Sequence, residues 1–360
     1  MKRYLTNTFQ SGNRVLLIID KDTIDFEVIH NNERHEFTAR YENLDFFFDM
    51  RDIPDIYYYL MLTVLFSGLE WVYIPISDYN IKAESYQAMP LVSYSGGIDS
   101  TAALHLTQGK PVHITRIFDM GYENRQIKAV NYVNAVQIHT DLELLRTIYM
   151  PTKGFNIGIG YVGPMLPLLY FYKNTTIALG TVLEGIAFHY GEKLTYISDY
   201  SNTRTYDLVS ILRTYGVNII QPLCGCSEVI TTQVAAKSGV RFVSSCHTNG
   251  SENFCKSCYK CFRKYGASGI KIPVDNALKK KLSTKPLPAA LSAVYAIQKA
   301  GYRGDLFDLY RNIDVSAAER VDMNCQIPFG GGYKIEGFEA MTEADHVKIN
   351  EFTDYLNSLK

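Results

Sequence analysis

Long apolar runs, excess charge of either sign and low-complexity tracts are all scarce in this sequence. The longest charge-free apolar run, residues 56–69 (IYYYLMLTVLFSGL), is shorter than the roughly 20 residues that a spanning helix needs, so we expect a buried helix and no membrane partner. The first residues lack the apolar core of a secretory signal. The formal net charge of −1 disfavours nucleic acid as a partner. These absences predict a cytoplasmic globular protein.

Three regions of the 360-residue chain differ in their pattern. Residues 1–88 carry two alternating runs between positions 14 and 30 that predict strands, followed by the apolar helix, and we interpret them as an accessory α+β region. Residues 89–268 form the second region. Residues 269–360 are predicted to be mainly helical, with candidate helices at 274–282, 289–300, 305–311 and 342–359.

The second region alternates strands with helices. The predicted strands are residues 91–95, 112–118 and 176–180, and the predicted helices are residues 99–106, 123–136 and 206–215. This alternation requires crossover connections and favours a mainly parallel sheet. The expected fold class is therefore α/β, a Rossmann-like parallel sheet with helices on both faces, with an α+β N-terminal addition and a helical C-terminal addition. Ligands of such sheets bind at the carboxyl ends of the strands.

The sharpest local signal is the segment SGGIDST at residues 95–101, which follows a predicted strand and opens a predicted helix. Two glycines allow a tight turn that brings backbone N–H groups close to an anion. The helix N-terminus behind them adds partial positive charge. The lysine of the Walker loop is missing, which disfavours chemistry between the β and γ phosphates. A plain glycine turn capping an ordinary helix is the alternative, and we favour a nucleotide phosphate site.

This segment resembles the pyrophosphate loop of the N-type, or PP-loop, ATP pyrophosphatases. The resemblance implies an adenine nucleotide alpha hydrolase-like fold and cleavage of ATP between its α and β phosphates, with Mg²⁺ as a cofactor. It implies catalytic roles for Asp99 and Ser100. The residues implied to bind ATP are Ser95, Gly96, Gly97, Asp99, Ser100 and Thr101, together with Phe118, Gly180 and Thr181 at the ends of later strands.

Four of the seven cysteines form a cluster in the sequence. Cys246, Cys255, Cys258 and Cys261 are spaced C-x8-C-x2-C-x2-C. Two short spacings place three thiolates on one tight turn, and the longer loop returns the fourth. Four cysteines without an open position are the set that structural Zn²⁺ prefers. An iron–sulfur cluster is the alternative that spacing alone leaves open.

The loop and the cysteines together narrow the resemblance to the 7-cyano-7-deazaguanine synthases of queuosine biosynthesis. Residues 117–133, 199–201, 222–240 and 245–266 are similar to segments of that family. The resemblance implies that ATP adenylates the carboxylate of a 7-deazaguanine, that ammonia or an amine then attacks, and that a second ATP drives formation of the nitrile. The positions implied to contact the substrate are Asn156, Glu184, Asp199 and Tyr200.

The chain departs from that family around its substrate segments. Phe155-Asn156 replaces a helix-opening arginine-asparagine pair, and residues 202–205 (NTRT) follow Asp199 in place of the family's sequence. The carboxylate acceptor, a small molecule or a protein, therefore stays open, as do a homodimer and partner proteins from the same operon. One alternative is a component of an antiviral (anti-phage) defence system that acts on another acceptor.

Two further classes of function remain as alternatives. An RNA-modifying thiolase would use the same loop with Cys224 or Cys226 as a sulfur carrier. A nucleotide-sensing subunit would bind ATP without releasing pyrophosphate. The string GIGYVG at residues 158–163 fits a dinucleotide-binding pattern, but Pro164 and Pro167 follow it, so we interpret it as a loop.

Overall fold

The structure is a computed structural model of the 360-residue chain. It describes residues 2–7, 14–45, 47–66, 89–116, 127–149, 160–241, 243, 246, 255–325 and 333–359. All structural statements below refer to these residues.

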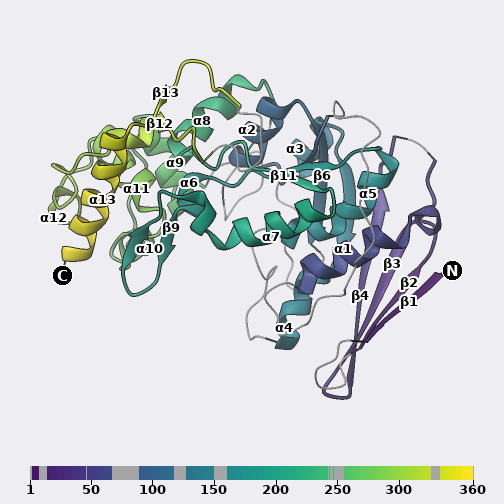
Figure 1. The fold of residues 1–360 in the computed structure, drawn as a ribbon. Helices are drawn as coiled ribbons and strands as arrows, with labels where there is room; N and C mark the ends of the chain where they lie inside the picture. The colour runs from purple at the N-terminus through teal and green to yellow at the C-terminus, as the bar shows by residue number, and fades with distance from the viewer. Residues whose placement is uncertain are drawn as a thin grey trace.

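One nine-stranded sheet runs through most of the molecule (Figure 1). Its strand order is β1-β2-β3-β4-β7-β6-β5-β8-β11. The bounds of its strands are β1 Lys2–Asn7, β2 Arg14–Ile19, β3 Thr23–His30, β4 Glu33–Glu42, β5 Leu91–Ser93, β6 Lys110–Arg116, β7 Val136–Thr140, β8 Thr176–Ala178 and β11 Asn218–Ile220. Two small two-stranded sheets contain β9 Phe188–Tyr190, β10 Leu194–Tyr196, β12 Arg320–Val321 and β13 Glu339–Ala340.

The central part of the sheet is parallel. Strands β7, β6, β5, β8 and β11 pair in parallel with one another. From β5 the chain adds β6 and then β7 on one side, and later adds β8 and β11 on the other. The strand order therefore reverses between β5 and β8, which is where the carboxyl ends of two neighbouring strands diverge to open a crevice.

Helices cover both faces of this parallel part. The longer of them are α1 Asp55–Phe66, α2 Ile98–Thr107, α7 Arg204–Thr214 and α8 Glu228–Lys237, and the shorter ones are α3 Ile127–Tyr132, α4 Leu145–Tyr149, α5 Leu166–Phe171 and α6 Leu183–Ile186. The two adjacent residues Leu91 and Val92 belong to different cores because successive strand residues face opposite sides. Leu91 lies in the core that contains α1, α5 and α7, whereas Val92 lies in the core that contains α2 and α8.

The N-terminal strands continue the same sheet. Strands β1 to β4 form an antiparallel meander, and β4 pairs antiparallel with β7, with Tyr41 opposite Ile138. Alternate residues of the meander are buried, so its apolar face packs under α1. The hydroxyl of Tyr41 donates to the Pro164 carbonyl oxygen at 2.8 Å, which fixes the meander to the helical layer. The predicted strands between residues 14 and 30 are confirmed, and the buried helix predicted from the apolar run at 56–69 is found as α1, up to Phe66 where the described segment ends.

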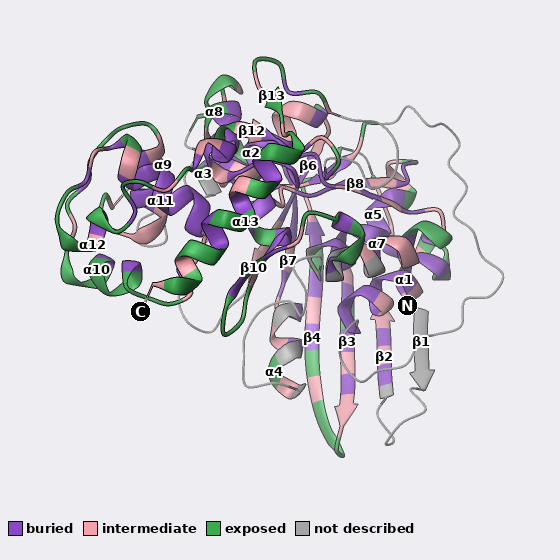
Figure 2. Ribbon diagram, turned by 60° about the vertical axis from the view of Figure 1, so that its left-hand side comes forward, coloured by how far each residue is buried: buried purple, intermediate pink, exposed green. Residues whose placement is uncertain are grey.

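The C-terminal helices gather at the end of the molecule opposite the N-terminal strands (Figure 1). They are α9 Tyr259–Ala267, α10 Asn276–Leu282, α11 Ala290–Lys299, α12 Asp305–Asp308 and α13 Glu343–Ser358. They share a second core with the cysteine cluster, and their buried residues face inward while the outer surfaces are exposed (Figure 2). The expected helical character of this region is confirmed. The remaining short helical turns are η1 Met50–Asp52, η2 Leu142–Leu144, η3 Gly160–Met165, η4 Tyr200–Asn202 and η5 Ser316–Glu319.

The α/β class and the mostly parallel central sheet are confirmed, but the predicted helix at 123–136 is wrong at its C-terminal end. The helix α3 ends at Tyr132, Asn134 has a left-handed φ of 49°, and Val136 begins strand β7. A left-handed residue ends a helix because it turns the chain away from the axis. In the parts of the chain that the structure describes, every helix is too short or too polar to span a bilayer.

Candidate functional site

The SGGIDST segment lies at the point where the strand order reverses. It connects β5 to α2, and Gly97 is the N-cap of that helix. Gly96 has a φ of 74°, a left-handed conformation that favours glycine. The hydroxyls of Ser95 and Ser100 lie 3.1 Å apart, and Ser100 Oγ also donates to the Gly97 carbonyl oxygen at 3.1 Å. The loop is therefore ordered by its own hydroxyl groups, next to the N-terminus of a ten-residue helix.

Gly180 brings the end of β8 against this loop. A Cβ atom at this position would lie 2.9 Å from the backbone of Asp99 and also 2.9 Å from the Ser100 nitrogen. Such a contact is too short for any side chain, so only glycine allows the two segments to approach. The expected neighbours Asp99, Ser100 and Gly180 thus lie side by side.

Two buried hydroxyl groups near the same edge of the sheet have no hydrogen-bond partner among the described residues. They belong to Thr115, at the end of β6, and Thr181, which follows Gly180. Strands β6 and β8 flank β5 on its two sides. Buried polar groups without partners are rare in folded proteins, and a bound ligand is one way to satisfy them. Both hydroxyls are therefore compatible with a polar ligand at this edge.

Asp99 is held by two residues from outside the loop. Its Oδ1 accepts a hydrogen bond from Thr231 Oγ1 on α8 at 2.6 Å and lies 3.2 Å from Lys264 Nζ on α9. Asp99 therefore does not cap α2; Gly97 occupies that position. The Asp99 side chain keeps 27% of its surface exposed while that of Lys264 keeps 6%. One carboxylate oxygen is committed to these contacts, and the partly exposed group can still bind a cation such as Mg²⁺.

Lys264 also contacts Glu228 on α8, at 3.4 Å from Oε2, and the neighbouring Arg263 Nη1 lies 2.6 Å from Glu228 Oε1. Burial alone would raise the pKa of Glu228, but the charges of Lys264 and Arg263 outweigh it and lower that pKa to about 2. Glu228 is therefore ionised at neutral pH and compensates two buried cations. The ion pairs that Lys264 forms with Asp99 and Glu228 therefore link the SGGIDST segment to α8 and α9.

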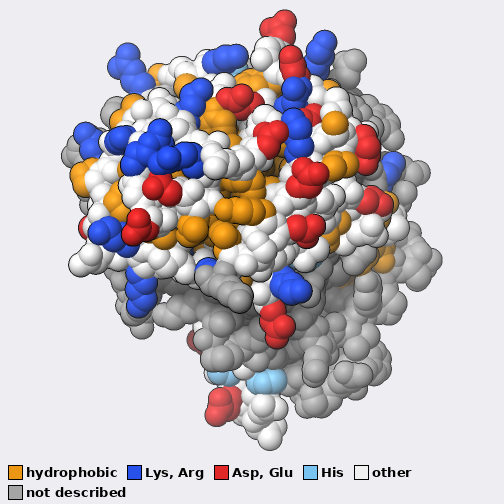
Figure 3. Space-filling model, turned by 90° about the vertical axis from the view of Figure 1, so that its left-hand side faces the viewer, with side chains coloured by type: hydrophobic (Ala, Val, Ile, Leu, Met, Phe, Trp, Pro, Cys, Tyr) orange, Lys and Arg blue, Asp and Glu red, His pale blue; other side chains and the backbone are white. Residues whose placement is uncertain are grey.

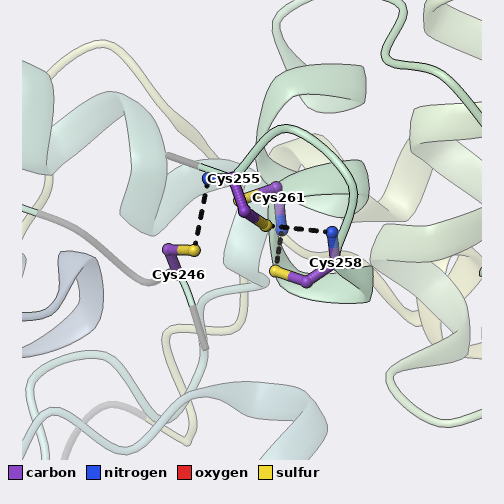
Figure 4. Close-up of side chains that lie close together, drawn as sticks. All are labelled: Cys246, Cys255, Cys258 and Cys261. Atoms are coloured by element: carbon purple, nitrogen blue, oxygen red, sulfur yellow. Dashed lines mark hydrogen bonds between the residues drawn. The ribbon is translucent and has the colours of Figure 1, made fainter. Parts of the chain in front are cut away.

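The four clustered cysteines bring their sulfur atoms together (Figure 4). All four Sγ atoms lie within 4.8 Å of one another, and Cys255 Sγ lies 3.8 Å from Cys261 Sγ. A tetrahedral Zn²⁺ with bonds of about 2.3 Å separates its sulfur ligands by about 3.8 Å. Backbone N–H groups of Cys258 and Ser257 donate to Cys255 Sγ at 3.2 and 3.5 Å, which stabilises a thiolate. The arrangement fits a structural metal ion such as Zn²⁺.

The pKa of Cys261 is raised, first because its thiol is hydrogen-bonded to Cys258 and then because it is buried. Lys256, between Cys255 and Ser257, has a left-handed φ of 52°, which turns the chain tightly around the sulfur atoms.

The last of the four cysteines, Cys261, lies just before Arg263 and Lys264 in the sequence. Cys258 is the N-cap of α9 and Cys261 lies in its first turn, whereas Arg263 and Lys264 lie one turn further on. Gly266 packs on α11, because a Cβ there would lie 2.5 Å from Ala296 Cβ. The cysteine cluster therefore lies at the start of α9, and α9 presents Lys264 to Asp99.

Two further residues that were predicted to bind ATP or substrate, Thr101 and Glu184, are buried inside the protein. Thr101 is fully buried beneath the loop, with its Oγ1 3.3 Å from the hydroxyl of Tyr94. Glu184 is also buried, and it accepts hydrogen bonds from Ser292 N and Oγ at 2.7 and 2.8 Å. Burial, and next the charge of Glu228, raise the pKa of Glu184. It therefore connects α6 to α11 inside the protein.

Asp199 and Tyr200 occupy the short turn before α7. Asp199 is exposed and accepts hydrogen bonds from the Ser201 backbone and hydroxyl at 2.9 and 2.7 Å. The Tyr200 side chain is buried, and its hydroxyl donates to Gln221 Oε1. Phe118 and Asn156 lie outside the described residues, as do Gly158 and Ile159 of the GIGYVG string, of which Gly160 to Gly163 belong to η3.

Four residues that contact Asp99 or one another at this site were not predicted from the sequence, namely Thr231, Glu228, Arg263 and Lys264. The available signal was the pair Arg263-Lys264 in the helix that follows the last cysteine. Two adjacent cations in a helix normally indicate a solvated surface, since charged residues are seldom buried without partners. Here both are buried, at 5% and 6% exposure, because Glu228 and Asp99 reach them from other helices.

Comparison with known proteins gives one match. A family model described as "Family of unknown function (DUF6395)" matches residues 207–286. The matched segment contains Thr231, Glu228, the four clustered cysteines and Lys264, and it excludes the phosphate loop. No curated protein matches the chain. No solved structure matches it either.

Proposed function

We propose that this protein is an ATP-dependent ligase of the PP-loop kind, which adenylates a carboxylate and then admits ammonia or an amine. A 7-deazaguanine carboxylate, as used by 7-cyano-7-deazaguanine synthases, is the proposed substrate. The observation that carries the proposal is the position of the SGGIDST loop, between the first parallel strand and α2, where the strand order reverses. Rossmann-like sheets with the order found here bind nucleotides at that point.

The proposed chemistry explains why ATP is needed. A carboxylate is a poor electrophile because it has no good leaving group. Its oxygen attacks the α-phosphorus of ATP, the bond to the β-phosphate oxygen breaks, and pyrophosphate leaves. Ammonia then attacks the acyl carbon, loses a proton and displaces AMP, which gives the amide. The amide oxygen then attacks the α-phosphorus of a second ATP and releases pyrophosphate. Loss of the two N–H protons and of AMP, which carries that oxygen away, gives the nitrile.

The chain's own residues supply the phosphate contacts. The loop amides and the hydroxyls of Ser95 and Ser100 donate to the outer phosphates of ATP. The ammonium of Lys264 adds a positive charge at the same place, although it comes from α9 and not from the loop. Charges fixed in this way stabilise a departing pyrophosphate more than mobile water does, because they need not reorganise.

Both proposed metal ions fit the residues that are present. Mg²⁺, when bound, would neutralise charge on the leaving pyrophosphate, and Asp99 is the residue that would hold it. Zn²⁺ on the four cysteines would be structural, since four thiolates leave no open position for water. Its contribution is to fix α9 and thereby Lys264.

The burial of two cysteines favours this proposal over an RNA thiolase. Cys224 and Cys226 are both completely buried, and burial raises the pKa of Cys224 well above that of a free thiol. A sulfur carrier needs an accessible thiolate. Neither residue meets that requirement in this structure.

The test is to incubate the zinc-loaded protein with ATP, Mg²⁺, ammonium and 7-carboxy-7-deazaguanine. Pyrophosphate, AMP and the nitrile are then followed by mass spectrometry. The proposal expects pyrophosphate and AMP in equal amounts, with formation of the amide and the nitrile. Pyrophosphate without the amide or the nitrile would contradict the proposed substrate alone. Release of orthophosphate only, or no ATP cleavage with any carboxylate, would contradict the ligase itself.

A further inference from the structure

A cavity of about 510 Å³ is lined by residues of α9 and of the segments packed beside it. Its walls come from the cysteine turn and α9, from α10 and from the turn before α11. Its walls include Cys258 of the cysteine cluster and the polar residues Ser257, Tyr259, Lys260, Arg263 and Lys281. None of the described residues that line it is acidic. The cavity is within the size range of sites for small molecules.

Two of its cations form no ion pair within the part of the chain that the structure describes. Neither Lys260 nor Lys281 forms an ion pair with a described residue, whereas the charge of Arg263 is offset by Glu228. The nearby Lys279 and Lys280 belong to the same helix as Lys281 but do not line the cavity. In the face formed by the C-terminal helices, lysine and arginine side chains gather on one side (Figure 3). The local field therefore favours an anion.

Arg263 provides an independent observation. It lines the cavity and is only 5% exposed, and its buried Nε has no hydrogen-bond partner among the described residues. The guanidinium lies 5.0 Å from the centre of the Tyr259 ring, and the Tyr259 hydroxyl donates to the Pro288 carbonyl oxygen at 2.5 Å, so both side chains are held in place. The guanidinium therefore adds a fixed positive charge to the wall of the cavity.

From these observations we infer that the cavity binds a phosphorylated small molecule, such as a sugar phosphate. Two unpaired ammonium groups match the charge of a phosphate monoester dianion, and the Ser257 hydroxyl offers one more donor. Inorganic phosphate alone would leave most of the volume empty. The apolar walls provided by Ala277, Leu278, Pro288 and Ala289 would contact the organic part of the ligand. This binding site does not depend on the proposed ligase activity.

The probe is ribose 5-phosphate, titrated into the zinc-loaded full chain by isothermal calorimetry, with ribose as the uncharged control. Substituting Lys260→Ala and Lys281→Ala together is expected to weaken binding at least about tenfold, since each charge-assisted hydrogen bond contributes roughly that factor. The matched control is Lys279→Ala with Lys280→Ala, which removes the same charge outside the cavity and is expected to change the affinity less than about twofold.

A second variant separates this site from the phosphate loop. Gly96→Asp places a carboxylate in the loop, where it repels anions, and is expected to leave ribose 5-phosphate binding unchanged. Zinc content and circular dichroism verify that each variant is folded. Equal affinities of the two double variants, loss of binding in Gly96→Asp, or equal binding of ribose would each overturn the inference.

Discussion

The Nζ atom of Lys264 lies 3.2 Å from Oδ1 of Asp99, although 165 residues separate the two in the sequence. Asp99 belongs to the phosphate loop and helix α2, and Lys264 to the helix organised by the four cysteines. This contact joins the two sequence motifs that carry the proposed function. The SGGIDST segment contains no lysine, and this contact brings one to it from the helix that begins at the cysteine cluster.

Lys264→Met tests the role of that charge, since methionine keeps most of the apolar stem. We expect kcat for pyrophosphate release to fall by about 10²–10³, as for the loss of other fixed groups that stabilise charge in a transition state. Lys264→Arg keeps the charge and should retain more activity. The control is Lys271→Met, an exposed lysine four residues beyond the end of α9. Equal kcat values for Lys264→Met and the control would contradict the role.

Thr231→Val tests whether Asp99 must be held in position. The buried Thr231 hydroxyl donates to Asp99 at 2.6 Å, and its loss is expected to cost about 1–2 kcal/mol in the free energy of unfolding. It should also raise the Mg²⁺ concentration needed for half-maximal activity. Thr232→Val is the control, because that hydroxyl donates only to the Glu228 carbonyl oxygen of its own helix. Denaturant unfolding and Mg²⁺ titration provide the measurements, and identical results for both variants would argue against a positioning role.

Gly180→Ala tests the contact between β8 and the loop. The added methyl group would lie 2.9 Å from the Asp99 backbone, so the segments must separate, at an expected cost of about 1–3 kcal/mol in stability. Because the loop moves, ATP binding should weaken as well. Gly185→Ala is the control, since a Cβ there has no neighbour within 4 Å. If thermal unfolding and ATP titration show no difference between the two variants, the close approach is not required.

The features of the fold and of the candidate site that could be predicted from the sequence are those that depend on a short, local stretch of residues. The SGGIDST segment and the cysteine cluster are short segments whose glycines and spacing determine their own geometry, so the turn before α2 and the proximity of the four cysteines could be predicted. The predicted end of the helix near Val136 was wrong, because a left-handed Asn134 has no strong signal in the sequence. Strand β4 was missed because its exposed positions carry many charges, as at Glu33 and Glu36.

The contacts of the candidate site lie between distant segments. Nothing in the local pattern around Lys264 indicates that Asp99 will reach it, and the sequence equally favoured a solvated helix surface. Glu184 illustrates the same difficulty, since its position after β8 suggested the ligand crevice while Ser292 binds it inside the protein. Residue type and spacing predict motifs, but pairing between buried charges depends on the assembled fold.

Removal of the metal is expected to disrupt the phosphate site at a distance. We expect one Zn²⁺ per chain by plasma mass spectrometry, and Cys258→Ser should lose it together with most pyrophosphate release, since α9 then no longer fixes Lys264. Cys226→Ala, a buried cysteine outside the cluster, should keep the metal. Full activity in a zinc-free Cys258→Ser protein would show that the metal site does not support the loop.

The pKa of Glu228 predicts how stability depends on acid. Its value of about 2 in the folded protein lies below the ordinary 4.5, so the folded state favours the ionised form. The contribution of Glu228 to the free energy of unfolding is therefore fully present above about pH 4.5 and is lost as the pH falls towards 2. Glu228→Gln removes it and leaves Arg263 and Lys264 less compensated, which is expected to cost about 3–5 kcal/mol at neutral pH. Denaturant unfolding of both proteins between pH 7 and 3, in the same zinc buffer, should show the difference shrinking with acid. A constant difference over that range would mean that Glu228 is not the ionised partner of the two cations.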